Sequence, residues 1–157
     1  MRYRRGGIFA DERENIVRRG ARPRPSGIII NNGVLINVGE EDIINGTFKI
    51  PEGVTQIDSG AFANCKSLTD IEIPKSVIRI EYGAFANCEN LTNIEIQEGV
   101  TQIGNNVFEG CSNITNIKIP EGVKVIGEYA FSGCSNLTNI EIPEGVSYIG
   151  DGAFSGC

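Results

Sequence analysis

The chain has 157 residues, of which 40% are apolar and 22% charged, a composition typical of one globular domain rather than a disordered segment. It contains no histidine and no tryptophan, which excludes Ser–His–Asp and Cys–His catalytic groups and the usual histidine-containing zinc sites. No stretch approaches the roughly 18 apolar residues that a membrane-spanning helix needs. We therefore expect no cofactor and no membrane span.

The formal net charge of −6 divides unevenly along the chain. Residues 1–27 carry eight arginines and three acidic residues, whereas residues 28–157 carry six Lys/Arg and 17 Asp/Glu. We interpret residues 1–27 as a basic, flexible arm with a short helix over residues 11–20. It is either an anchor to nucleic acid or to an acidic partner, within an intracellular assembly, or a solvated linker. The candidate contact residues of the arm are Arg2, Arg4, Arg5, Arg18, Arg19, Arg22 and Arg24.

The N-terminus also lacks the apolar segment of a secretory signal. That observation leaves two interpretations open, an intracellular protein or a processed form, so the sequence does not fix the location.

Residues 28–38 read IIINNGVLINV, two apolar runs around Asn32-Gly33. This pair favours a type I′ turn, so the segment is predicted to be a β-hairpin that caps the N-terminal edge of the core. Residues 46–51, GTFKIP, resemble the strand of a degenerate first repeat, and the predicted capping region covers residues 28–49.

A repeat of 23 residues occupies residues 50–157. The five cysteines recur at this period, and a phenylalanine lies three residues before each of them. The cysteines are Cys65, Cys88, Cys111, Cys134 and Cys157. Such a period predicts a solenoid, because one unit buries too little apolar surface to offset its ordering entropy and must stack on its neighbours.

One unit predicts three local structures. Asp70-Ile71-Glu72-Ile73 alternates in polarity, which indicates a strand with both isoleucines inward. Pro-Glu-Gly, or Pro74-Lys75-Ser76, predicts a type I turn with proline second and glycine fourth, without a need for positive φ. Ala-Phe-x-x-Cys places Phe and Cys on one face of a helical turn.

These motifs, LTNIEIP followed by EGVxxIGxxAFxxC, closely resemble the BspA-like (Treponema pallidum-type) leucine-rich repeats. The resemblance covers four full repeats and most of a fifth. It implies a solenoid with a parallel strand ladder on its concave face and short strands and helical turns elsewhere. It also implies an adhesion or partner-binding role at a cell surface.

The cysteines have several candidate roles, of which buried structural thiols are the favoured one. Equivalent residues stack about 4.8 Å apart, but parallel side chains lie alongside rather than toward one another, which disfavours disulfides. No CxxC pair begins a zinc site. Free thiols fit a reducing compartment, in contrast to the surface location that the resemblance implies.

Outward strand positions form a polar, acidic strip, the candidate site for a basic or polar protein partner. Its residues are Asp70, Glu72, Asn93, Glu95, Asn116, Lys118, Asn139 and Glu141. The alternative is a solvated sheet with cross-strand Lys–Glu pairs. No aromatic side chain marks a binding hot spot on the strip, and no catalytic residue is predicted.

Two further features concern the ends of the repeats. Asn90, Asn113 and Asn136 begin N-x-T glycosylation sequons, but we expect these amides to form local hydrogen bonds to the backbone instead. The chain stops at Cys157, midway through a unit and without a polar cap. We expect either a fragment of a longer array or an end that associates with another chain.

Overall fold

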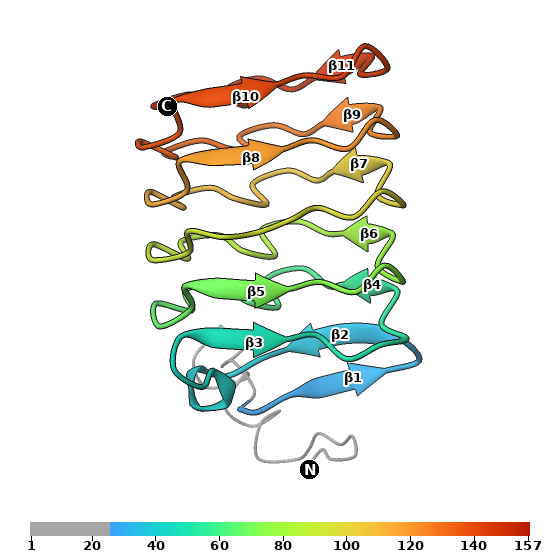
Figure 1. Ribbon diagram of the computed structural model, residues 1–157, viewed down its shortest axis with the longest axis vertical. Helices are drawn as coiled ribbons and strands as arrows, with labels where there is room; N and C mark the ends of the chain where they lie inside the picture. The colour runs from blue at the N-terminus through green and yellow to red at the C-terminus, as the bar shows by residue number, and fades with distance from the viewer. Residues whose placement is uncertain (1–25) are drawn as a thin grey trace, which may run out of the picture.

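The computed structural model describes residues 26–157. The arginine candidates of the basic arm lie outside the described residues. The described part is a β-solenoid, as predicted, in which successive turns of the chain stack along one axis (Figure 1). We call each 23-residue turn a coil, and the five coils begin at Ile50, Ile73, Ile96, Ile119 and Ile142.

The back sheet has seven strands in the order β1-β2-β4-β6-β7-β9-β11. Its strands are β1 (Ile29–Asn31), β2 (Val34–Asn37), β4 (Gln56–Ile57), β6 (Arg79–Ile80), β7 (Gln102–Ile103), β9 (Val125–Ile126) and β11 (Tyr148–Ile149). All neighbours pair in parallel except β1 and β2, which are antiparallel.

The β1–β2 pair confirms the predicted hairpin. Its turn residues Asn32 and Gly33 have φ of 50° and 79°, the two left-handed positions that a type I′ turn requires. Because β2 pairs with β4 of the first coil, the hairpin continues the stack at its N-terminal edge.

Two short sheets form the opposite side, which we call the front (Figure 1). One pairs β3 (Thr47–Lys49) with β5 (Asp70–Glu72), and the other pairs β8 (Asn116–Lys118) with β10 (Asn139–Glu141), both in parallel register. The single 3-10 helix of the described residues, η1 (Glu40–Asp42), precedes β3.

A column of stacked aromatic rings runs through the core. Phe62, Phe85, Phe108, Phe131 and Phe154 stack with centroids 5.0–5.6 Å apart and interplanar angles of 2–14°. Phe48 closes the N-terminal end of the column edge-on to Phe62, at 5.5 Å and 71°. Each aromatic contact adds about 0.5–1.5 kcal/mol to the burial of the rings, so the column binds every coil to its neighbour.

The Ala-Phe-x-x-Cys segments form successive tight turns rather than the expected helical turn. Cys65 N donates to Phe62 O within the coil, whereas Phe62 N donates to Ala84 O of the next coil. Half of the N–H groups are therefore used between coils, which a helix would not allow. Phe62 and Cys65 still share one buried face, as predicted.

This turn pattern requires left-handed backbone at two positions in every coil. The residues before Ala-Phe or Val-Phe and before Cys have φ of 56–77° in every repeat, a region where Gly and Asn are the tolerated residues. Tyr129, with φ of 56°, is the exception among otherwise Gly and Asn positions. The alternation of Gly and Asn at these positions was the sequence signal for turns instead of a helix.

The Pro-Glu-Gly turns are shifted by one residue from the prediction. Val54 N donates to Pro51 O, and the other coils repeat this bond, so proline is first and glycine third. The pairing of the front strands continues through Ile50, whose N–H donates to Glu72 O at the end of β5, so the turn cannot begin before Pro51. Only Gly53 among these turns has positive φ, at 93°, so the position does not demand it.

Candidate functional site

The front carries the eight polar residues predicted as the partner-binding strip. In β5, β8 and β10 the central isoleucine packs inward and its two neighbours are exposed. The parallel register places Asn116 beside Asn139 and Lys118 beside Glu141. All eight strip residues are exposed. The structure therefore brings them together in two columns, while their role in binding stays a prediction.

The charges of the strip are solvated and mostly acidic. Lys49 Nζ lies 3.6 Å from Glu72 Oε1, with both side chains about 70% exposed. Ion pairs this exposed contribute little to stability because water and salt screen them. Glu72, Glu95 and Glu141 are thus available to an incoming positive charge.

The strip is interrupted at its centre, which the sequence did not predict. Asn93 forms only an isolated bridge to Asp70, and residues 94–97 have no strand pairing to β8. Ile94 is half-buried, in contrast to the buried Ile71 and Ile117 at the same position. The local sequence LTNIEI recurs at residues 137–142, and Gln97 follows it where the other turns have proline.

The five thiols form a column in which each donates to a carbonyl of the preceding turn of the chain. Cys88, Cys111 and Cys134 donate to carbonyl oxygens 26 residues earlier, at 3.0–3.2 Å. None of the five forms a disulfide, and all but Cys157 are buried. The prediction of buried structural thiols is confirmed for four of the five, and Cys157 is the exposed one.

Burial suppresses ionisation of these thiols. It raises the pKa of Cys134 to about 12, and the neighbouring Cys157 thiol adds to the rise. Burial, together with the thiols of Cys88 and Cys134, also raises the pKa of Cys111 well above its usual value. A nucleophilic cysteine needs the opposite shift, so the column has the chemistry of a core.

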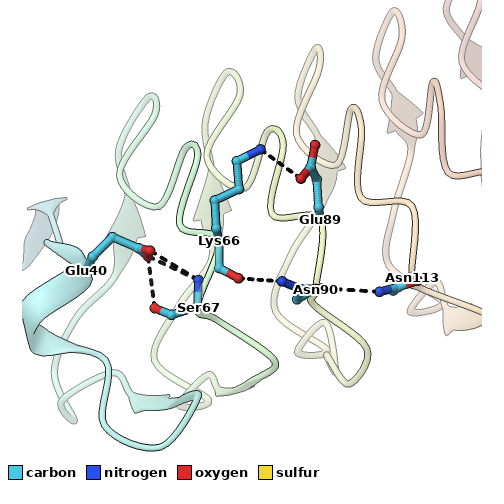
Figure 2. Close-up of polar contacts among 6 residues, drawn as sticks. All are labelled: Glu40, Lys66, Ser67, Glu89, Asn90 and Asn113. Carbon is cyan, nitrogen blue, oxygen red and sulfur yellow. Dashed lines mark hydrogen bonds and ion pairs between the residues drawn. The ribbon is translucent and has the colours of Figure 1, made fainter.

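A second polar array runs along the edge where the chain enters β5, β8 and β10 (Figure 2). Asn90 Nδ2 donates to Lys66 O at 2.7 Å, Asn113 Nδ2 to Asn90 Oδ1 at 3.4 Å, and Asn136 Nδ2 to Asn113 Oδ1 at 3.3 Å. We call Asn90, Asn113 and Asn136 the asparagine ladder. The expectation of local side-chain-to-backbone bonds is therefore wrong for all three. Asn90 does bond to a backbone carbonyl, but one of the preceding coil, and the other two bond to the amide stacked beside them.

The N-terminal end of this array is held by η1. The Glu40 carboxylate accepts bonds from the N–H and the hydroxyl of Ser67, at 2.9–3.2 Å (Figure 2). Lys66 Nζ and Glu89 Oε1 form a pair at 2.8 Å between the first and second coils. The edge is thus linked by side chains from Glu40 to Asn136.

The C-terminal coil exposes residues at positions that are buried in the other coils. Ile142 and Ile149 are 38% and 45% exposed, whereas Ile119 and Ile126 are at most 3% exposed. Association of this end with another chain stays a prediction.

Two kinds of site are not found in the described part of the chain. Residues 26–157 contain no group of three or more His, Cys, Asp or Glu side chains placed to hold a metal ion. In the same residues no helix is long and apolar enough to cross a membrane.

A family model described as the BspA type leucine rich repeat region matches residues 43–157 in six copies. It thus begins before Ile50 and includes the degenerate first repeat. The predicted boundaries after residues 27 and 49 stay predictions. No curated protein matches the chain.

Solved bacterial structures share the fold. A leucine rich cell surface protein from Faecalibacterium prausnitzii is 40% identical with a TM-score of 0.75, covering 79% of this chain and 32% of its own. The Treponema pallidum leucine-rich repeat protein is 31% identical with a TM-score of 0.73, covering 79% of this chain and 59% of its own. A Bacteroides ovatus leucine-rich repeat protein is 32% identical with a TM-score of 0.71, covering 84% and 37%. The chain therefore spans a third to three-fifths of the length of these proteins.

Proposed function

Because this chain belongs to the BspA-type leucine-rich repeat family, we propose that it is a non-catalytic module that binds a protein partner through the front strip. Members of the family commonly mediate protein–protein interaction or adhesion. The leucine-rich repeat solenoid is typically a non-enzymatic scaffold. The proposal assigns this chain no active site and a role in adhesion or partner binding.

The observation that carries the proposal is the exposure of all eight strip residues on the front of the stacked coils, six of them on paired strands. Side chains held on strands keep their spacing, so a partner can meet them without ordering them first. The charge of the strip and the excess of acidic residues over residues 28–157 favour a basic or polar partner surface.

The test is a triple charge reversal of Glu72, Glu95 and Glu141 to lysine. The partner is captured with the immobilised full chain, purified, and its affinity measured for both proteins. We expect the reversal to weaken binding by about tenfold or more, since it replaces attraction with repulsion. Circular dichroism should be unchanged, because all three side chains are exposed.

A matched control separates the strip from the overall charge. Glu52, Glu121 and Glu144 are exposed glutamates of the Pro-Glu-Gly turns, and reversing them changes the net charge by the same amount. The partner should bind this control nearly as well as the original chain. Equal losses for both triple variants, or none for the strip variant, would exclude the strip as the binding surface.

A second candidate function rests on the basic arm of residues 1–27. It is an assembly component that the arm anchors to nucleic acid or to an acidic partner, with the solenoid as a spacer. The charge of the arm supports it, and its contact residues lie outside the described part of the chain.

A further inference from the structure

The side-chain amides of the asparagine ladder have more hydrogen-bond donors and acceptor positions than the bonds between coils use. A side-chain amide has two N–H donors and two acceptor positions on its oxygen. Asn113 uses one donor toward Asn90 and one acceptor position for Asn136. Asn90 likewise uses one donor toward Lys66 O and one acceptor position for Asn113. Each therefore retains one donor and one acceptor position.

The leftover groups are held in place before any ligand arrives. The Asn90 amide is held at both ends by the coils on either side (Figure 2). Asn113 is held in the same way, and Asn136 is held at its nitrogen by Asn113. Asn90 and Asn136 are exposed. Next to the ladder, Thr92 Oγ1 donates to Thr69 O at 3.1 Å, which fixes that exposed hydroxyl as an acceptor. The edge thus presents ordered neutral donors and acceptors at the spacing of the coils.

We propose that the asparagine ladder binds a neutral polysaccharide lying along the axis of the solenoid. Each sugar hydroxyl both donates and accepts, which matches an amide that offers one of each. An extended peptide matches poorly, because groups on one side of a strand recur every two residues, about 6.6 Å apart, whereas coils recur at about 4.8 Å. The many hydroxyls of a sugar chain need no such register.

The surrounding charges select an uncharged polymer. The ladder itself is neutral, and Lys66 neutralises Glu89 beside it. Residues 28–157 carry 17 Asp/Glu against six Lys/Arg, which repels a polyanion. The ladder residues include no aromatic side chain, so contact at one coil is weak and binding depends on a polymer that spans several coils.

The experiment is native affinity electrophoresis of the full chain in gels containing dextran, laminarin, galactomannan or hydroxyethyl cellulose, with heparin as the polyanion. One neutral hydrogen bond changes affinity by about two- to tenfold. The combined Asn90→Ala, Asn113→Ala and Asn136→Ala variant should therefore bind at least about tenfold more weakly to the polysaccharide that retards the chain.

The control is the combined Asn93→Ala, Asn116→Ala and Asn139→Ala variant, which removes the same residue type from the same turns of the chain but on the front strip. It should be retarded within about twofold of the original chain. Circular dichroism checks the fold of both variants. Should the ladder variant not fold, the single Asn113→Asp variant, which removes the donor and adds a negative charge, should show the loss instead.

Three results would overturn the proposal. They are no retardation of the original chain by any neutral polysaccharide, retardation by heparin alone, and equal losses in the ladder and control variants. The control variant alters the front strip, whereas the ladder variant leaves it unchanged. Measuring protein binding and polysaccharide binding for both variants therefore shows which surface each ligand uses.

Discussion

Replacing Phe108 with alanine tests whether the aromatic column holds the coils together. Phe108 is fully buried and stacks on Phe85 at 5.6 Å and on Phe131 at 5.4 Å. The loss combines about 2–3 kcal/mol of burial with two ring contacts and a cavity, or about 4 kcal/mol in all. Phe154 is only half-buried and has one stacked neighbour, at 5.5 Å, so Phe154→Ala should cost about 1–2 kcal/mol.

Urea unfolding of the full chain, followed by circular dichroism, measures both free energies. In a solenoid each repeat contacts only its neighbours, so a central defect can also divide the transition into two. Equal losses for Phe108→Ala and Phe154→Ala would contradict this role of the aromatic column, because stability would then not depend on contacts between neighbouring coils.

The remaining predictions concern the thiols, the backbone and the arm. Iodoacetamide should alkylate only Cys157 in the folded protein at pH 8.5, and rapid labelling of Cys134 would contradict the burial described above. Folding raises the pKa of Cys134 from 9.0 to about 12. The protonated thiol therefore contributes fully to the free energy of unfolding below pH 9, and this contribution declines as the pH rises toward 12. Urea unfolding across that pH range measures the decline. Tyr129→Asn should stabilise the fold by about 1 kcal/mol, because asparagine tolerates the left-handed backbone of this position, whereas Tyr82→Asn at an ordinary φ should not. If residues 1–27 bind nucleic acid, replacing their arginines by glutamine should abolish a steeply salt-dependent affinity; binding that survives the change would exclude the arm.

The period of Phe and Cys made the fold predictable from the sequence. Residues that are 23 positions apart can be buried together only if each repeat follows the same backbone path as the one before it. The period therefore predicted the stacked coils, the inward isoleucines and the column of thiols. The hairpin followed from Asn32-Gly33, whose turn type depends on local backbone alone.

Other features depend on contacts between coils, which local patterns do not show. Phe62 N donates to a carbonyl of the next coil instead of to its own coil. The Ala-Phe-x-x-Cys segments therefore form stacked turns and not helical turns. The side-chain bond from Asn113 to Asn90 depends on the distance between coils, and so the ladder was not predicted. The break after Asn93 occurs in a segment whose sequence matches a paired one, so local sequence could not reveal it.

Site-specific photo-crosslinking is the most direct test of whether the front strip contacts the partner. A photoreactive side chain is placed at Asn116 on the front or at Gln102 on the back sheet, both exposed residues of the third coil. We expect the captured partner to crosslink to position 116 and not to position 102. Crosslinking at position 102 alone would contradict this expectation and place the binding surface on the back sheet.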